Sequence, residues 1–251
     1  MSREPRVAVF RPADERIDRA VELLASLGTR PVPDPMLAVD PTGATPEPAE
    51  YVVFTSKTGV ELAAEAGWRP ADAGEDGRPT LVAIGPSTAE RARETGWTVD
   101  RVPAEYSSAG LVDALADEVA GAAVEVARSD HGSPTLLNGL REAGAVVAET
   151  ALYRLTIPSD AGDSVALAAA GELAAAAFTS SLTVEHFCSV ATDRGVREAA
   201  VAGLNDAVVG AIGDPTAEAA ADLGVEVDVV PEAADFERLA RAVVEATASP
   251  D

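Results

Sequence analysis

Lysine, cysteine and histidine are nearly absent from this chain of 251 residues. Lys57 is the single lysine, and arginine supplies every other basic side chain. The single cysteine, Cys188, excludes an intrachain disulfide and a zinc site built from cysteines, and its apolar neighbours favour a place in the core. The two histidines, His131 and His186, lack the spacing of paired metal ligands, so we expect no metal site.

Basic charge is also scarce overall. Asp and Glu number 42 against 19 Lys and Arg, which gives a formal net charge of −23. No stretch of the sequence is basic, and this argues against nucleic acid or an anionic lipid surface as a partner. Acidic surfaces stay hydrated in concentrated salt, where their self-repulsion is screened, so the composition is typical of a halophile-like protein.

Long hydrophobic runs are missing as well. The alanine-rich run at residues 165–178 is shorter than the roughly 20 residues that span a bilayer, and it contains Glu172. The N-terminus is charged and enters a predicted strand at once, without the pattern of a signal peptide. We therefore expect a cytoplasmic protein with no membrane segment.

The chain does contain an alternation of short apolar runs and amphipathic stretches, which predicts parallel sheets with helices on both faces. The predicted strands are residues 7–10, 51–55, 81–84, 98–102, 123–127, 146–153, 173–178, 207–212 and 226–230. The predicted helices are residues 16–27, 60–66, 88–95, 110–120, 134–143, 215–223 and 236–246.

The sequence contains an internal repeat of one structural unit. The triplet Phe-Thr-Ser at residues 54–56 recurs at 178–180, and the segment at 83–89 recurs at 211–217. More loosely, residues 7–11 resemble residues 124–128. Each copy holds about five strands with intervening helices, a count that fits a flavodoxin-like doubly wound unit.

Hydroxyl-rich turns follow corresponding strands in both copies. Thr58 with Glu61, and Ser87 with Glu90, have the spacing of capping boxes. A helix N-terminus also attracts carboxylate or phosphate, so these turns could bind a polyanion, or they could simply cap their helices. The candidate binding residues in these turns are Thr55, Ser56, Lys57, Ser87, Thr88, Thr179, Ser180 and Thr216.

Further candidates stand at strand ends. Arg11 follows the first strand, and Arg128 with Ser129 follows the corresponding strand of the second copy. Tyr153 is expected at a strand end, where it either packs or gives a proton to a leaving hydroxyl.

The chain has no P-loop, dinucleotide fingerprint or G-x-S-x-G motif, and no acid–histidine pair for a serine nucleophile. His131, next to Asp130 in a turn after a strand, could be a proton shuttle but is more typical of a surface loop, and His186 is more typical of a packed or exposed helix residue.

Taken together, these motifs resemble the uroporphyrinogen-III synthase family, in order and over nearly the whole chain. The residues that carry the resemblance are 53–56 with Val60, 83–85 with 88–89, 96–103, 106–108 with 110–111, 140–145, 149–154, 178–180, and 212–213 with 216–217. Each motif alone is weak, and the order and spacing make the resemblance specific.

The resemblance implies an α/β fold of two flavodoxin-like doubly wound parallel-sheet lobes, joined by a two-stranded antiparallel linker, with a cleft between the lobes. Residues 1–35 and 158–251 would form one discontinuous lobe, and residues 40–152 the other. The linker strands would lie near residues 36–39 and 153–157.

The resemblance also implies the reaction: closure of the linear tetrapyrrole hydroxymethylbilane with inversion of ring D and loss of water, without a cofactor. Tyr153 would be the proton donor, and the hydroxyls of Ser56, Thr88, Ser180 and Thr216 would face the ligand. The family's usual Pro or Gly after Ser180 is missing, since Ser181 and Leu182 follow instead. We expect a monomer that transiently contacts the preceding enzyme of its pathway.

Two other functions remain open at this point. A two-lobed module could hold a polyanionic ligand and have lost the chemistry, although the retained Tyr153 argues against that loss. A cleft enzyme acting on sugar phosphates is the third reading, and the absence of a metal cluster or a base histidine counts against it.

Overall fold

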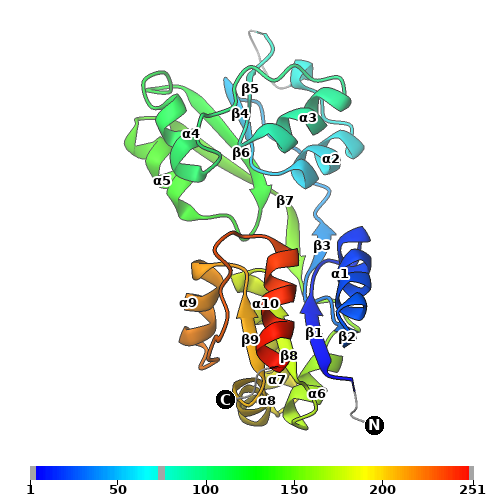
Figure 1. Ribbon diagram of the computed structural model, residues 1–251. Helices are drawn as coiled ribbons and strands as arrows, with labels where there is room; N and C mark the ends of the chain where they lie inside the picture. The colour runs from blue at the N-terminus through cyan, green and yellow to red at the C-terminus, as the bar shows by residue number, and fades with distance from the viewer. Residues whose placement is uncertain (1–3, 73–76, 249–251) are drawn as a thin grey trace. The chain divides into compact units, whose positions relative to one another are not determined.

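The computed structural model describes residues 4–72 and 77–248. The chain divides into two compact units. Unit 1 is Met1–Ala38 together with Thr156–Asp251, and unit 2 is Val39–Leu155. Each unit has its own sheet, which confirms the predicted α/β class with parallel sheets (Figure 1).

The sheet of unit 1 has the strand order β2-β1-β8-β9, and every neighbouring pair is parallel. Its strands are β1 (Arg6–Phe10), β2 (Arg30–Pro33), β8 (Ala175–Phe178) and β9 (Val208–Ala211). Its helices are α1 (Glu15–Ser26), α6 (Asp163–Ala169), α7 (Ser181–Asp193), α8 (Arg197–Asn205), α9 (Asp214–Asp222) and α10 (Phe236–Ala248).

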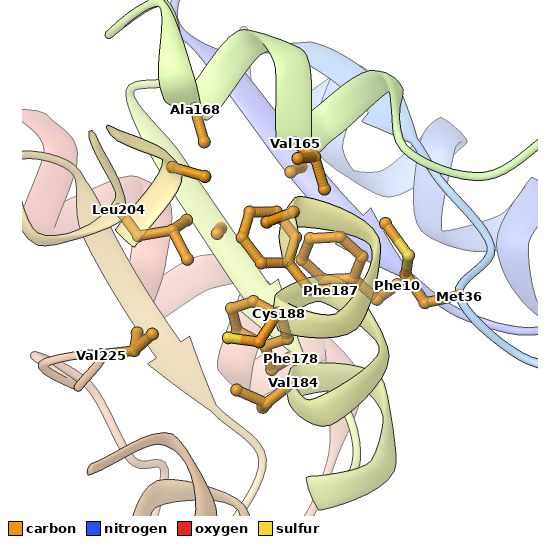
Figure 2. Close-up of a cluster of buried hydrophobic side chains, with 14 of the residues drawn as sticks. Phe10, Met36, Val165, Ala168, Phe178, Val184, Phe187, Cys188, Leu204 and Val225 are labelled. Carbon is orange, nitrogen blue, oxygen red and sulfur yellow. The ribbon is translucent and has the colours of Figure 1, made fainter. Parts of the chain in front are cut away.

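Both faces of this sheet are covered, because successive strand residues point to opposite sides. Val7 and Val9 of β1 pack with α1 and α10, whereas Ala8 and Phe10 face the cluster under α6 to α9. Figure 2 shows the aromatic centre of that second cluster. The rings of Phe10 and Phe178 stack with centroids 4.4 Å apart, and Phe187 of α7 meets both edge-on at 5.9 Å. Stacking between neighbouring strands therefore locks β1 to β8.

The sheet of unit 2 has the order β3-β7-β6-β4-β5, and β7, β6, β4 and β5 run parallel. Its strands are β3 (Ala38–Pro41), β4 (Tyr51–Phe54), β5 (Thr80–Ala83), β6 (Ala123–Ser129) and β7 (Val146–Thr156). Its helices are α2 (Lys57–Glu65), the short 3-10 helix η1 (Pro70–Asp72), α3 (Pro86–Glu94), α4 (Ser108–Leu115) and α5 (Pro134–Glu142).

Each unit combines halves of both sequence copies. In unit 1 the first half of copy one, β1-α1-β2, joins the second half of copy two, β8 to β9. In unit 2 the second half of copy one, β4 to β5, joins the first half of copy two, β6-α5-β7. The strand orders β2-β1-β8-β9 and β7-β6-β4-β5 then correspond one to one, so the repeat produces two units of the same topology.

Several predicted elements were wrong. Residues 98–102 and 226–230 do not form strands but only single bridges, Val82 with Arg101 and Gly210 with Val229. The prediction also missed β2, whose sequence Arg-Pro-Val-Pro looks unfavourable for a strand. Because β2 is the edge strand, its prolines need no partner on the open side.

Candidate functional site

The carboxyl ends of two central strands mark a binding position in each unit. In unit 1, β1 connects to β2 on one side and β8 leads to β9 on the other, so the topological switch point lies between β1 and β8. In unit 2 it lies between β6 and β4. Open α/β sheets bind ligands at such points. Arg11, Thr179 and Ser180 lie there in unit 1, and Ser129, Thr55 and Ser56 lie there in unit 2.

Two equivalent serines cap the helices that begin at these points. Ser56 is the N-cap of α2, and its Oγ accepts a hydrogen bond of 2.9 Å from the Gly59 N–H. Ser180 is the N-cap of α7, and its Oγ accepts one of 3.3 Å from the Thr183 N–H. Both hydroxyls thus cap their helices, which is one of the two roles that the sequence left open for these turns.

The predicted capping boxes were wrong because both helices begin earlier than the sequence suggested. Thr58 lies inside α2, since Ser56 already caps it. Ser87 lies inside α3, whose N-cap is Gly85 and whose first residue is Pro86. Proline fits that first position because its missing N–H would have no partner there.

Tyr153 is held by a bulge in β7. Arg128 of β6 pairs with Ala151, but the next residue, Ser129, pairs with Tyr153, so Leu152 is an extra residue. The bulge puts Leu152 and Tyr153 on the same face of the sheet, where both join the cluster around Phe54. Tyr153 therefore lies within β7 and not at its end, contrary to the prediction.

The hydroxyl of Tyr153 reaches the capping serine. Its Oη lies 3.0 Å from Ser56 Oγ, while the residue as a whole is only 7% exposed. The Tyr153 carbonyl accepts a 3.1 Å hydrogen bond from the Asp130 N–H, and Asp130 in turn accepts one from the Leu155 N–H. Both the ring and the backbone of Tyr153 are therefore fixed.

Asp130 is charged in this arrangement. Its burial opposes the charged form, but hydrogen bonds from His131 and from the Leu155 N–H outweigh this and lower the pKa of Asp130. His131 thus serves a carboxylate that holds β7. His186, by contrast, is buried in α7, with Nδ1 2.5 Å from the Met36 carbonyl oxygen.

The helices at the edge strands carry a second equivalent pair. Thr88 in the first turn of α3 and Thr216 in the first turn of α9 are 3% and 4% exposed. Ser87 beside Thr88, and Lys57 in the first turn of α2, are exposed. The N-terminal ends of α2, α3, α7 and α9 thus all stand at carboxyl ends of strands.

The equivalent residues Arg11 and Arg128 differ in their hydrogen-bond partners. Arg128 is 6% exposed and fully engaged, since Nε donates to Glu149 at 2.6 Å and Nη1 to the Ser133 carbonyl at 2.6 Å. A side chain at Gly132 would collide with this guanidinium. Arg128 is therefore used within unit 2.

Arg11 keeps its guanidinium available. Its Nε is buried without a hydrogen-bond partner among the described residues, and its Cζ lies 4.7 Å from the centre of the Phe236 ring. Burial, with the neighbouring charge of Arg16, lowers the pKa of Arg11. A cavity of about 310 Å³ beside it is lined by α1, Arg11 and the start of α10.

Two hydroxyls near Ser180 hold the turn together. Thr179 Oγ1 donates to the Phe10 carbonyl at 2.7 Å, which ties the ends of β8 and β1. Ser181 Oγ donates to the Pro215 carbonyl at 2.9 Å, which ties the start of α7 to that of α9. The serine that departs from the family pattern therefore has a structural partner.

Tyr106 is a further candidate that the sequence analysis did not name among the binding residues. Its side chain is 62% exposed, and a side chain at Gly85 would touch its Cβ at 3.4 Å. A large exposed aromatic beside the N-terminus of α3 is a candidate for stacking on a ligand ring. Its rarity was the available signal, because the chain has only three tyrosines.

Residues 4–72 and 77–248 hold neither a metal-binding cluster nor a membrane-spanning helix. No group of three or more His, Cys, Asp or Glu side chains there is placed to hold a metal ion. None of the helices in this part is long and apolar enough to cross a membrane.

Comparison with known proteins identifies the family. The model of the family described as uroporphyrinogen-III synthase HemD matches residues 18–241. The chain belongs to the uroporphyrinogen-III synthase family. It is thereby a lyase of tetrapyrrole biosynthesis with a small tetrapyrrole as its substrate. A candidate uroporphyrinogen-III synthase of Methanothermobacter thermautotrophicus is 34% identical over 227 residues, which cover 84% of this chain and 86% of that protein.

Solved synthases share the fold. A uroporphyrinogen III synthase variant of Thermus thermophilus superposes with a TM-score of 0.68 at 22% identity, over 96% of this chain and 98% of that one. The enzyme of Helicobacter pylori gives a TM-score of 0.60 at 13% identity, over 98% of this chain and all of that one. Both confirm a two-lobed α/β fold for this family member.

Proposed function

We propose that this synthase closes hydroxymethylbilane to the type III isomer with Tyr153 as its acid. The observation that carries the assignment is the Tyr153 hydroxyl, held 3.0 Å from Ser56 at the switch point of unit 2. A fixed phenol beside a helix N-terminus suits a reaction that needs one proton and charge stabilisation, and not a nucleophile or a metal.

The first step breaks the bond between the substrate's terminal methylene and its hydroxyl. The pyrrole nitrogen lone pair expels the hydroxyl, the Tyr153 proton goes to it, and water leaves. The phenolate then carries the charge that the azafulvene cation balances. The substituted α-carbon of ring D bonds to the azafulvene methylene and gives a spiro intermediate. The bond from that carbon to the methylene between rings C and D then breaks, which leaves a second azafulvene cation on ring C. Its methylene bonds to the free α-carbon of ring D, so that ring D is inverted. Loss of the proton from the newly bonded carbon returns a proton to the site.

The substrate carboxylates bind at helix N-terminal ends, where free N–H groups and the dipole favour anions. In unit 2 these contacts come from the starts of α2 and α3, and in unit 1 from those of α7 and α9. Arg11 adds a cation to these contacts. The proposed contact residues are Arg11, Thr55, Ser56, Lys57, Ser87, Thr88, Ser129, Ser180 and Thr216. Arg128 and Thr179 shape the site from within the fold, since their polar groups are already bonded.

The same proposal covers partners and location. We propose that the enzyme works as a monomer. The proposal is supported by the few large exposed hydrophobics among residues 4–72 and 77–248, which are Val39, Tyr106, Val146 and Val230. A transient contact with the preceding enzyme would shorten the time in which the substrate closes by itself. The lone buried Cys188, whose thiol pKa is raised by burial, suits the reducing cytoplasm.

Isomer analysis of the product tests the proposal. Purified protein with hydroxymethylbilane should yield the type III isomer faster than the type I isomer forms spontaneously. Type I alone would overturn it. Calorimetry with the product, run in parallel, distinguishes the alternative of a non-catalytic module, which would bind the product and leave the isomer ratio unchanged.

A further inference from the structure

We infer that Ser56 is a positioning residue that donates its hydroxyl proton to Tyr153 Oη, and so keeps the Tyr153 proton free for the leaving group. This inference rests on the proposed acid role of Tyr153. It gives Ser56 a task in the chemical step, beyond capping α2 and beyond contact with the substrate.

The other bond that Ser56 makes favours this direction of the hydrogen bond. Ser56 Oγ accepts the Gly59 N–H at 2.9 Å, so one of its lone pairs is occupied and its single proton remains to be given. Accepting a hydrogen bond polarises a hydroxyl and makes it a better donor. If Tyr153 donated to Ser56 instead, its proton would already be engaged by Ser56 Oγ.

The surroundings favour negative charge on Tyr153 Oη. Ser56 stands at the N-terminus of α2, the positive end of a nine-residue helix. Once Tyr153 has given up its proton, the Ser56 hydroxyl donates to a phenolate, and hydrogen bonds to charged groups are stronger than those between neutral groups. The contact therefore strengthens as the proton is transferred, which is what a contribution to the rate requires.

The close approach of the two hydroxyls is built into the fold. The bulge at Leu152 turns Tyr153 toward α2. At Gly59 a Cβ would stand 3.2 Å from Ser56 Oγ and 3.3 Å from Leu152 Cδ1, so glycine leaves the space that both side chains use. Within the described residues, the side chain of the equivalent serine of unit 1, Ser180, hydrogen-bonds only with Thr183 of its own helix. Both units therefore have the serine N-cap, and unit 2 has the contact with Tyr153 in addition.

A double-mutant cycle with steady-state kinetics tests the inference. Ser56→Ala should lower kcat about tenfold, as the loss of one charge-assisted hydrogen bond predicts, and any rise in KM reports the substrate contact of Ser56 separately. Ser56→Thr should restore most of kcat, because it keeps both the hydroxyl and the cap. In a Tyr153→Phe background, Ser56→Ala should have no further effect on kcat, since the group through which Ser56 acts is gone.

A matched control removes a serine cap whose proton goes to another acceptor. Ser107 caps α4 by accepting from the Gly110 N–H at 3.0 Å, in the same Ser-x-x-Gly pattern, and its hydroxyl donates to Glu105 Oε1 at 2.6 Å. Ser107→Ala should shift the melting temperature as Ser56→Ala does and leave kcat unchanged. If Ser56→Ala folds poorly, Ser56→Gly removes the hydroxyl while keeping most of the cap preference.

Different outcomes test the role of Ser56, the role of Tyr153 and the reaction itself. A Ser56→Ala variant that raises KM with kcat unchanged, or one whose kcat falls equally in the Tyr153→Phe background, would overturn the positioning role. Full activity of Tyr153→Phe would instead overturn the proposed acid. Production of type I alone by the unmodified protein would overturn the proposed reaction.

Discussion

The guanidinium of Arg11 lies 4.7 Å above the ring of Phe236, whereas its equivalent in the other unit, Arg128, lies in an ion pair with Glu149. Similar strand ends therefore carry one cation that forms no ion pair among the described residues, although Asp14 and Asp235 lie near enough to act on its charge, and one that is paired with a carboxylate. In a chain with a formal net charge of −23, a cation held by an aromatic ring at a strand end is well placed to attract an anion.

Arg11→Gln should raise KM for hydroxymethylbilane about tenfold and leave kcat close to its original value, because the lost charge serves binding. The effect should shrink as salt screens the attraction. Arg241→Gln is the matched control, since it removes one exposed arginine from α10. Equal KM changes in the two variants would mean that only net charge matters.

Tyr153→Phe should lower kcat by about 10²-fold, the lower range for one general acid, and keep the melting temperature within a few degrees. The ring stays in the cluster around Phe54, and only the contact with Ser56 Oγ is lost. Rates of type III formation and thermal unfolding measure the two effects. A variant with an unchanged rate would rule out the acid role.

Glu125 is a buried carboxyl in the middle of β6. It is 1% exposed, and neither carboxyl oxygen has a hydrogen-bond partner among the described residues. Burial raises the pKa of Glu125, and it outweighs the nearby Thr150 side chain and Glu47 backbone, which lower that pKa although neither makes a hydrogen bond of good geometry; the charges of Glu47 and Glu149 add to the rise. Because its folded-state pKa lies above the unfolded value, the folded state binds more protons, and stability falls as pH rises through this window.

Glu125→Leu should therefore stabilise the protein, by about 1–3 kcal/mol at pH 8 and by less at pH 5. The substitution removes a buried group that is costly to ionise and fills the same space. Urea unfolding at the two pH values gives the comparison. A variant that is less stable than the original protein at pH 8 would show that Glu125 makes a favourable interaction.

Arg128→Met should destabilise unit 2 by roughly 1–3 kcal/mol, a value discounted because Glu149 is one-third exposed. The substitution removes the ion pair and the bond to the Ser133 carbonyl together. Arg101→Met is the control, since its pair with Glu118 is exposed on both sides and should contribute less than about 1 kcal/mol. Chemical denaturation compares them, and equal losses would contradict the burial argument.

The predicted strands succeeded where local pattern and burial agree, as in the runs at β1, β4 and β8. The predictions failed where the role of a residue depends on its position in the sheet or at a helix start. Pro31 and Pro33 belong to an edge strand, and Thr58 loses the cap to Ser56 because α2 begins earlier. Those outcomes depend on pairing and helix starts that a single sequence leaves open.

The residues of the candidate site could be predicted from the sequence, but their partners could not. The hydroxyl turns, Arg11 and Tyr153 are visible as residue types at strand ends. Their partners are not, because Ser56 and Tyr153 are 97 positions apart and meet only through the β6–β7 register and its bulge. The contrast between Arg11 and Arg128 is likewise invisible in two similar segments.

The sequence by itself determined the parallel α/β class, the duplication and the family, because periodicity, turn residues and motif order are local properties. Only the tertiary structure decided which halves of the two copies share a sheet, which arginine stays available and which serine meets the tyrosine. The physical reason is that strand pairing, bulges and burial bring distant residues together, and their consequences for charge and hydrogen bonding exist only after that pairing.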